Sequence, residues 1–471
     1  MKFIFYSILF SFFSIQGISQ SCNCEENVKA IIKGIEENYA GIFDKTGEPN
    51  TSKYLKLKTQ LLKRSHESPL DYKCIQLISD YISFFNDSHI SIRRMTNSPE
   101  AKLFWNQVFG NIYKRPVPLD TSAFKESLST SIDKIEGFWD NDQNNLSVAI
   151  VKKDKYTYEG VVIKADSVIW YPGQIKFEIN MDSRKGVFYS NLHIPKQTTF
   201  IVNGRDILFE RYGRFTKRTA GVYQPSLPEF KLYSINDSVT CITLPSFDQK
   251  NMKIVDSLIE SNKNRLDTVK YLIVDIRDNT GGSNQVFRNL RPYLLPASYT
   301  LWGYKIRASV DNANFYESVS KDTLMLESNR KWFLDISLIM RDSLKYKFVI
   351  NNGNTFVENE ESRGHFKKIF FLINTRTASA AEQLLEWASQ NPICVTVGQS
   401  TAGVIDYSNL NPTYELPCKF INLAYPTIRS NVVDKHGRVP NEGLKPDIII
   451  SMPNEKWLDY VVNKLICSTC K

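Results

Sequence analysis

Two hydrophobic periodicities divide the first half of the chain. Between Asn27 and Asn86 the stretches "NVKAIIKGIEENYAGIF" and "CIQLISDYISFF" repeat apolar residues at three- and four-residue spacing, which predicts amphipathic helices. The following "FFNDSHISIRR" changes to alternation, so residues 87–89 are expected on a turn before a strand. We assign residues 21–118 to a small helical N-terminal region.

The middle of the chain follows the period of a β-strand. The stretch "LSVAIVKKDKYTYEGVVIKADSVIWYPGQIKFEI" alternates apolar and polar residues, and turn residues separate the runs. The pattern continues in "GVFYSNLHI" and "TTFIVNGRDILFERY". It predicts a small antiparallel β domain, a barrel or a sandwich, over residues 125–225.

The second half has the pattern of an α/β domain, which we assign to residues 229–455. After the strand "VTCITLPSF" and the helix "MKIVDSLIESNK", the continuous apolar runs "YLIVDI", "KIFFLIN" and "CVTVG" are typical of parallel strands buried on both faces. The helix "AAEQLLEWASQ" joins the last two runs into a right-handed βαβ unit. Residues 305–366 are too many for a simple loop and predict either a lid over the substrate or extra helices.

Charge and the first residues restrict the partners and the location. The 471 residues carry a net charge of +9, with lysines interspersed among acids and aromatics, which favours a solvated surface over a nucleic-acid stripe. Lys2 followed by the apolar run Phe3–Ile15 predicts a signal peptide over residues 1–20. No stretch is apolar enough for a membrane span. A lipid anchor on Cys22 is a weaker alternative.

The eight cysteines become possible disulfide partners if the chain is exported. We expect structural staples at the two termini, from Cys22 and Cys24 at one end and from Cys467 and Cys470, in a tail over 456–471, at the other. A metal site is the alternative for each pair, but neither has histidines nearby. Cys241, inside an apolar strand pattern, is expected to be a buried free thiol.

Two segments that follow strands could carry chemistry. In "DIRDNTGGSN" the adjacent Gly281 and Gly282 allow a ligand to approach the backbone amides, which could hold an oxyanion or simply form a turn. In "TASAAE", Ser379 lies where a helix begins, and the helix N-terminus favours a negatively charged nucleophile. Ser379 and Glu382 also match a capping box, and this segment alone favours the cap.

A serine nucleophile requires a base, and histidine is the usual one. Of the five histidines, His89 in the turn "NDSHIS" is best placed; the others are His66, His193, His365 and His436. In "NEGLKPDIII", Glu442 precedes a final strand and could orient the histidine as the third member of a triad, or be a surface residue.

In this order, "DIRDNTGG", "TASAAE", "VGQSTAG" and "EGLKPDI" resemble the C-terminal-processing (tail-specific) and tricorn-type serine peptidases over about residues 239–452, with an outlying match at Asp87–His89. The resemblance implies a crotonase-like α/β catalytic domain within a multidomain α+β chain. It also implies that Ser379 is the nucleophile, and that Gly281 or Gly282 with the amide of Ala380 forms the oxyanion hole.

The sequence departs from the tail-specific branch in two ways. That branch uses a lysine after the glycine of a "T-x-G-K" stretch, but here the stretch is Thr401–Val404 and ends in valine. The tricorn-like branch uses a histidine from a Ser-His pair, which Ser88 and His89 match, together with a glutamate, which Glu442 matches. The middle domain lacks the "GLGF"-type loop of a PDZ module, and "IEGFWDND" faintly resembles the start of a lipocalin-type barrel.

These observations predict an exported peptidase, periplasmic or extracellular, that acts on peptide or protein substrates through an acyl-enzyme. Ser88 would help to orient His89, and no metal or organic cofactor is required. One alternative is a catalytically inactive, peptidase-like binding protein, since the lysine is missing. Another is a crotonase-like enzyme acting on thioesters, although no further phosphate-cradling loop is present. The substrate and the oligomeric state remain open.

Overall fold

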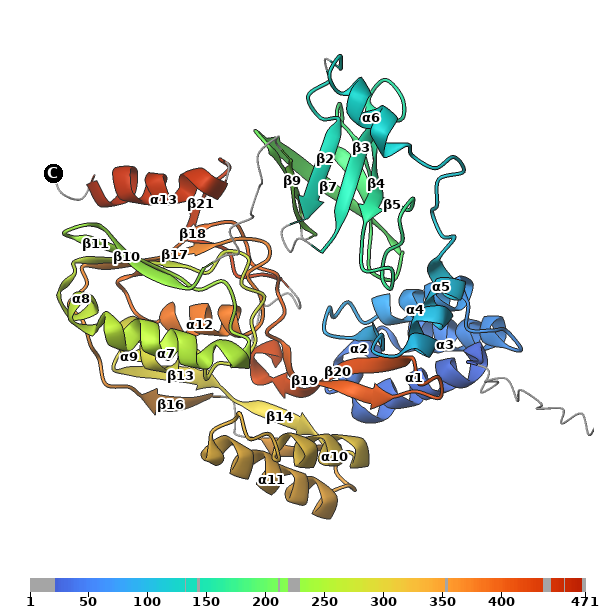
Figure 1. The fold of residues 1–471 in the computed structure, drawn as a ribbon. Coiled ribbons are helices and arrows are strands. Elements are labelled where there is room, and N and C mark those ends of the chain that lie inside the picture. The colour runs from blue at the N-terminus through green and yellow to red at the C-terminus, as the bar shows by residue number, and fades with distance from the viewer. Residues whose placement is uncertain are drawn as a thin grey trace, which may run out of the picture.

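The computed structural model describes residues 22–131, 133–141, 145–210, 212–218, 229–351, 355–434, 442–452 and 454–467. The predicted signal peptide, residues 1–20, therefore lies outside the described residues. Figure 1 shows three bodies: a helical region, a barrel and an α/β domain. Within the described ranges, no helix is long and apolar enough to cross a membrane.

The N-terminal region is helical, as its periodicity predicts. Asn23 begins the first helix by accepting a hydrogen bond from the amide of Glu26, and Asp71 accepts one from the amide of Cys74 at the start of the fourth. The elements are α1 (Cys24–Asn38), α2 (Ile42–Thr46), α3 (Thr51–Ser65), α4 (Tyr72–Ser83), β1 (Ser91–Arg94) and α5 (Pro99–Phe109).

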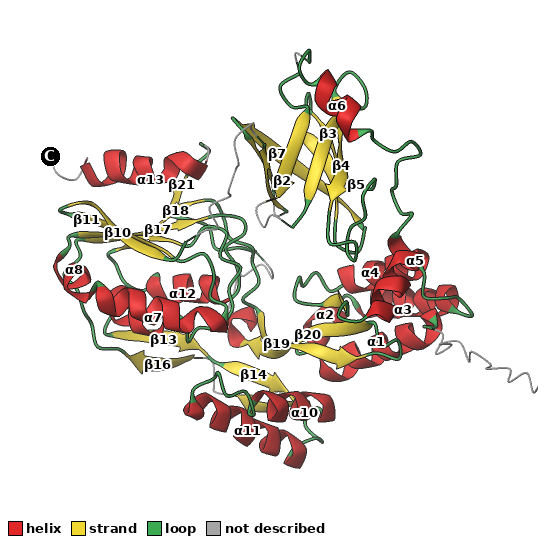
Figure 2. Cartoon of the chain, in the orientation of Figure 1, coloured by secondary structure: helices red, strands yellow, loops and turns green. Residues whose placement is uncertain are grey.

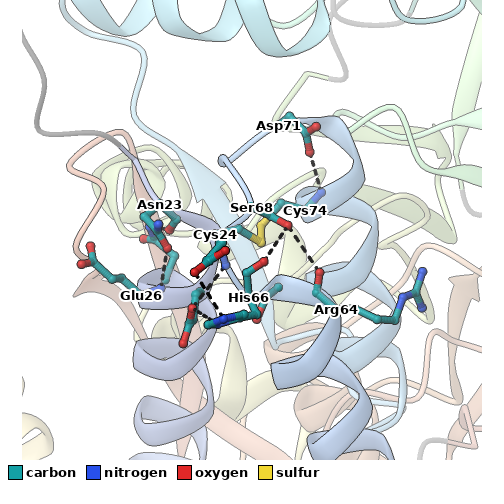
Figure 3. The surroundings of a disulfide bond; sticks show 12 residues. Asn23, Cys24, Glu26, Arg64, His66, Ser68, Asp71 and Cys74 are labelled. Carbon is teal, nitrogen blue, oxygen red and sulfur yellow. Dashed lines mark hydrogen bonds and ion pairs between the residues drawn. A yellow bond between two sulfur atoms is a disulfide. The ribbon is translucent and has the colours of Figure 1, made fainter.

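Two disulfides secure this region. Cys24 bonds to Cys74, which joins the starts of α1 and α4 (Figure 3). Cys22 bonds to Cys418, 396 residues away. The N-terminal cysteines thus form staples with internal partners. The predicted staple at the C-terminus is not formed by Cys467, which is a free, exposed thiol, while Cys470 lies outside the described residues.

The middle region is a closed barrel in which eight strands pair in chain order, so the predicted antiparallel β domain is confirmed as a barrel. Alternate side chains such as Trp139, Phe177 and Phe215 fill its core. It follows α6 (Thr121–Ser127) and consists of β2 (Gly137–Asn141), β3 (Ser147–Lys152), β4 (Thr157–Lys164), β5 (Ile175–Asn180), β6 (Lys185–Tyr189), β7 (Pro195–Asn203), β8 (Asp206–Phe209) and β9 (Gly213–Lys217).

The α/β domain is built on a six-stranded sheet with the order β10-β11-β12-β17-β18-β21. All neighbours are parallel except β10 and β11, and helices lie on both faces (Figure 2). Cys241 of β11 is a buried free thiol, as predicted. The strands are β10 (Lys231–Asn236), β11 (Val239–Thr243), β12 (Tyr271–Asp275), β17 (Lys368–Ile373), β18 (Cys394–Gly398) and β21 (Ile448–Ile449).

The helices that cover this sheet pack through two apolar clusters. One cluster contains residues of α7 and α12 and the other contains Trp457 of α13. Helix α12 joins β17 to β18, which confirms the predicted parallel βαβ unit. The helices are α7 (Met252–Ser261), α8 (Lys263–Thr268), α9 (Arg291–Leu294), α12 (Ala380–Ala388) and α13 (Trp457–Tyr460), and the chain continues in a π-helical segment, Val461–Ile466.

A second sheet connects the helical region to the α/β domain. Its order is β1-β20-β14-β15, with β19 also paired to β20. The long segment 305–366 contributes extra helices and strands to this part of the molecule. The elements are β13 (Ser298–Trp302), β14 (Tyr304–Arg307), α10 (Val310–Val319), α11 (Glu327–Asp342), β15 (Phe348–Asn351), β16 (Thr355–Asn359), β19 (Tyr407–Glu415) and β20 (Ile421–Ser430).

Candidate active site

Ser379 lies between β17 and α12 in a strained backbone conformation. Its φ of 54° and ψ of −121° lie in a region that a residue with a side chain rarely adopts. The loop before it is fixed by Thr377, whose hydroxyl donates to the carbonyl of Ile276 at 3.0 Å, and by the amide of Ala378, which donates to the carbonyl of Asn279 at 2.9 Å. Tertiary contacts therefore impose the strain on Ser379.

Glu382, rather than the Ser379 hydroxyl, organises the start of α12. Its fully buried carboxylate accepts the amide of Ser379 at 3.0 Å. The hydroxyl of Ser379 faces the helix start in a loose capping-box arrangement but makes no side-chain capping hydrogen bond of normal geometry. In a capping hydrogen bond, Oγ of Ser379 would accept the amide of Glu382. The lack of one with normal geometry means that the hydroxyl is only loosely held at the helix start.

The same carboxylate also binds the Thr401–Val404 stretch. Oε1 of Glu382 accepts the hydroxyl of Thr401 at 2.5 Å and the amide of Gly403 at 2.7 Å, and Oε2 accepts the amide of Val404 at 2.9 Å. Four donors therefore satisfy one buried carboxylate. Val404, which occupies the position where the tail-specific branch has lysine, is held through its backbone.

Of the two glycines in the loop after β12, Gly281 lies against Ser379. Gly281 has a φ of +90°, and a Cβ there would lie 2.7 Å from Cβ of Ser379 and 2.8 Å from the amide nitrogen of Ala380. Gly282 has a φ of +138° and packs against the backbone of Phe247. Glycine is required at both positions because no side chain fits.

Hydrogen bonds distinguish the amides of these glycines. The amide of Gly281 donates to Oδ1 of Asn279 at 2.9 Å, and Asn279 in turn donates to the carbonyl of Leu244 at 2.8 Å. Asp275 and Arg277 form an ion pair in this loop, with Arg277 Nε 2.8 Å from Asp275 Oδ1. The loop is thus rigid, and the amide of Gly281 already has an acceptor.

His89 lies on the turn before β1, beside a buried carboxylate. Its backbone amide donates to Asp87 Oδ1 at 2.9 Å, and its ring Nδ1 lies 3.6 Å from the same oxygen. The hydroxyl of Tyr39 donates to Asp87 Oδ2 at 2.9 Å. Burial raises the pKa of Asp87, against the attraction of His89 and the hydrogen bonds that it accepts. Nδ1 of His89 is buried without a hydrogen-bond partner among the described residues.

Paired strands connect the His89 turn to the segment that Glu382 binds beside Ser379. β1 begins two residues after His89 and pairs with β20, which pairs with β19. β19 begins at Tyr407, whose ring contacts that of Tyr39 at 5.5 Å, and Tyr407 lies three residues after Val404. No hydrogen bond or ion pair joins His89 to Ser379 in the part of the chain that the structure describes.

The remaining predicted site residues lie closer to the surface. Ser88 is exposed. The carboxylate of Glu442 forms an ion pair with Lys445 at 2.9 Å, while the next residue, Gly443, packs on the backbone of Thr401. Glu442 therefore adjoins the loop that Glu382 binds, without a described contact to His89.

The other histidines do not gather here. His193 is completely buried against the barrel, His66 contacts Glu25 at 2.8 Å, His365 is exposed, and His436 lies outside the described residues. Within the described ranges, no three His, Cys, Asp or Glu side chains are grouped as a metal ion would require.

Sequence reasoning assigned no role to two parts of this site. One is the pair of Asp87 and Tyr39 at His89. The carboxylate two residues before the histidine in "NDSH" was a signal for Asp87, but Tyr39 is 48 residues away from it. The other is the contact of Glu382 with Thr401–Val404, since a capping box indicates only the local half of its hydrogen bonds.

The parallel sheet, the glycine loop and the strained serine at a helix N-terminus all belong to the α/β domain. Residues 238–450 match the model of peptidase family S41. The matched part is the α/β domain, and the match supports a peptidase of the C-terminal-processing and tricorn type, as the sequence resemblance predicts. A search of curated proteins found no match.

Solved structures of low sequence identity align over most of this chain. The crystal structure of a CPAF mutant aligns with a TM-score of 0.50 at 10% identity, covering 95% of this chain and 96% of that one. The photosystem II D1 C-terminal processing protease aligns at 0.40 and 12% identity, covering 94% and 97%. The tricorn protease aligns at 0.41 and 13% identity, covering 95% of this chain and 37% of that one.

Proposed function

We propose that this chain is an exported serine peptidase that hydrolyses peptide bonds through an acyl-enzyme formed on Ser379. The observation that carries the proposal is the strained φ of 54° at Ser379, at the start of α12 and against Gly281. Strain of this kind persists only where surrounding contacts impose it, and it is concentrated at functional sites.

In the proposed reaction, His89 takes the proton of the Ser379 hydroxyl as Oγ forms a bond to the peptide carbonyl carbon. The protonated histidine then gives this proton to the leaving amine as the C–N bond breaks. Water, deprotonated by His89, attacks the ester, and the proton returns to Ser379 as the acid is released. No further co-reactant is required.

The oxyanion of the tetrahedral intermediate would be held by backbone amides beside Ser379. The amide of Ala380 is the first of α12, where helix amides have no partner within the helix. Since the amide of Gly281 donates to Asn279, we assign the second donor to Gly282 and give Gly281 the role of allowing close approach. These donors would stabilise developing negative charge.

The base requires a partner that orients its ring. Asp87 lies 3.6 Å from Nδ1 of His89, and a small rotation of the ring would make this contact a hydrogen bond. Glu442, near the Thr401 loop, is the second candidate for this role, and the exposed Ser88 would affect the turn only through its backbone position. A direct Ser379–His89 contact would form when a substrate closes the site.

Export is proposed from the disulfides. Two are present, Cys22–Cys418 and Cys24–Cys74, and such bonds persist in oxidising compartments. The periplasm or the cell exterior therefore suits the chain.

The test is labelling with a fluorophosphonate probe, which reacts with activated serines. The probe should label the wild type and should not label Ser379→Ala. It should label His89→Ala at least about a hundredfold more slowly than the wild type. Ser389→Ala, an exposed serine at the other end of α12, is the matched control and should behave as wild type. Labelling of Ser379→Ala at the wild-type rate would show that Ser379 is not the nucleophile.

The same experiment addresses a second function, an inactive peptidase-like binding protein. Two observations favour it: Val404 stands where a lysine base would be, and His89 has no described contact with Ser379. A folded wild-type chain that the probe does not label, together with a peptide that binds without being cleaved, would establish this second function in place of the first.

A further inference from the structure

A cavity of about 220 Å³ opens at one end of the barrel, beside the α/β domain. Its wall includes Trp170, Lys176 and Phe188 of the barrel, and also Arg376, which lies three residues before Ser379 in the loop after β17. Figure 1 shows the barrel standing above the space between the α/β domain and the helical region. The peptidase mechanism proposed above makes no use of this cavity.

Lys176 is the unusual residue in the wall. Its side chain is buried, with 4% of its surface exposed. Nζ donates to the carbonyl of Tyr189 at 2.6 Å and lies 4.1 Å and 4.3 Å from the ring centroids of Trp170 and Phe188. No carboxylate among the described residues forms an ion pair with this ammonium, which has three hydrogens to donate.

The other charges near Lys176 do not neutralise it. Burial, and then the positive charge of Arg94, lower the pKa of Lys176 well below its ordinary value. Arg94 contacts Nδ1 of His193 at 3.2 Å, and burial depresses the pKa of His193 to about 2, so that this ring is neutral. Asp166 lines the cavity, but its Oδ1 accepts the amides of Val168 and Ile169.

The rim of the cavity carries two further cations. Arg214 is 4.0 Å from Asp206, and Arg376 is 3.8 Å from Asp278. The cavity therefore combines aromatic walls with three basic side chains, those of Lys176, Arg214 and Arg376. A buried ammonium is costly unless an anion pairs with it, and aromatic walls favour an apolar ligand body.

We propose that this cavity binds a small organic carboxylate with an apolar body. The carboxylate accepts hydrogen bonds from Nζ of Lys176, and the apolar body lies against Trp170 and Phe188. Arg376 and Arg214 add positive charge at the rim. Two kinds of molecule could supply such a carboxylate: a free carboxylic acid and the C-terminal end of a peptide chain.

The test is titration calorimetry on the full-length Ser379→Ala variant, which separates binding from any cleavage. Hexanoate should bind at millimolar concentration or below, and hexanol, which has the same body without the charge, should bind at least about tenfold more weakly. Equal binding of the acid and the alcohol, or no binding of hexanoate, would overturn the proposal.

Variants at two lysines assign the binding to the cavity. Lys176→Met keeps the bulk and removes the ammonium, and it should weaken hexanoate binding by about tenfold or more. Lys185 is an exposed lysine at the start of the next strand, β6. The variant Lys185→Met should bind hexanoate as tightly as the Ser379→Ala protein that carries no lysine substitution. Unchanged binding in a folded Lys176→Met variant would overturn the proposal, and thermal unfolding of both variants reports whether they fold.

Two peptides identify the source of the carboxylate. If a chain end is the natural ligand, a short apolar peptide with a free C-terminus should bind more tightly than hexanoate, and its C-terminally amidated form should bind at least about tenfold more weakly. If a free acid is the natural ligand, hexanoate should bind and neither peptide should. Either result supports the carboxylate site; tighter binding of the amidated peptide than of the free one would contradict it.

Discussion

The Ser379 loop and the His89 turn are two short irregular segments that the fold holds by different means. Ser379 lies inside a network in which Glu382, Asn279 and Thr377 satisfy nearly every backbone group around it. His89 is held by its backbone, through Asp87 and the following strand β1, while its ring nitrogen Nδ1 has no hydrogen-bond partner among the described residues.

Under the proposed mechanism, this difference indicates how the catalytic work would be divided. Ser379 is held in a strained conformation by contacts within one domain. His89 comes from a separate region that is joined through strand pairing and a disulfide, so its approach to the serine would depend on the relative position of the two regions. The serine side should therefore respond to local substitutions, and the histidine side to changes that loosen the connection.

The largest effect is expected from Gly281→Ala. The added Cβ would lie 2.7 Å from Cβ of Ser379 at a φ of +90°, so the serine has to move, and the rate of fluorophosphonate labelling should fall by about a hundredfold or more. Gly204→Ala is the control, because that glycine also has a positive φ but nothing lies within 4 Å of its Cβ position. Labelling of Gly281→Ala at the wild-type rate would show that the loop is not rigid.

Glu382→Gln tests the hydrogen-bond network beside Ser379. An amide cannot accept all four donors that the carboxylate accepts, so the free energy of unfolding should fall by about 3 kcal/mol, with slower labelling. Denaturant unfolding measures the first and probe kinetics the second. Glu386→Gln, one turn later on α12 and partly exposed, should change neither by much; equal losses in both variants would mean that the network is unimportant.

The next prediction concerns the helical region that carries His89. The Cys22–Cys418 disulfide connects the segment just before α1 to the segment between β19 and β20. The double variant Cys22→Ser, Cys418→Ser should lose about 2–4 kcal/mol of unfolding free energy. Its labelling rate should fall further than its stability explains, if the disulfide helps to hold the His89 turn beside β20. Cys467→Ser removes a free thiol and serves as the control. Wild-type labelling by the double variant would show that strand pairing is sufficient.

The smallest effect concerns Asp87 and pH. Burial raises its pKa, so its protonated form favours the native state: this contribution is fully present below the ordinary carboxyl pKa and is lost as pH rises through the raised value. Asn does not ionise, so Asp87→Asn should gain stability relative to wild type as pH rises, by about 1.4 kcal/mol per unit of raised pKa.

Comparison of the two proteins by thermal unfolding from acid to neutral pH measures this trend, with the exposed Asp80→Asn as a control. Labelling of Asp87→Asn should slow by about tenfold or more, because His89 loses the carboxylate that orients it. Glu442→Gln should then have the smaller effect. The reverse order would make Glu442 the partner of His89.

Much of the architecture could be predicted because it depends on local periodicity. The helical period of "NVKAIIKGIEENYAGIF" corresponds to α1, the alternation in the middle of the chain to the barrel, and the apolar run "YLIVDI" to a strand whose five residues are all buried. When a helix or strand buries one face or both, its apolar residues recur with a period that can be seen in the sequence.

Chemistry-bearing segments were also visible, but only as separate candidates. From residue order alone we could predict that a serine begins a helix, that two glycines follow a strand and that a histidine lies on a turn. Residue order did not decide between capping and catalysis for Ser379, because both require the same residues at the same spacing. The positive φ and the four donors on Glu382 favour the catalytic role.

Which distant groups meet depends on the tertiary packing. Tyr39 reaches Asp87 across 48 residues of the helical region. Cys22 reaches Cys418 where the pairing of β1 with β20 joins this region to a segment more than three hundred residues away. Likewise, Arg376 joins Lys176 around one cavity although they belong to different domains. Such contacts depend on the packing of whole elements, and no local pattern records them, since each partner is chosen by geometry rather than by its neighbours in the chain.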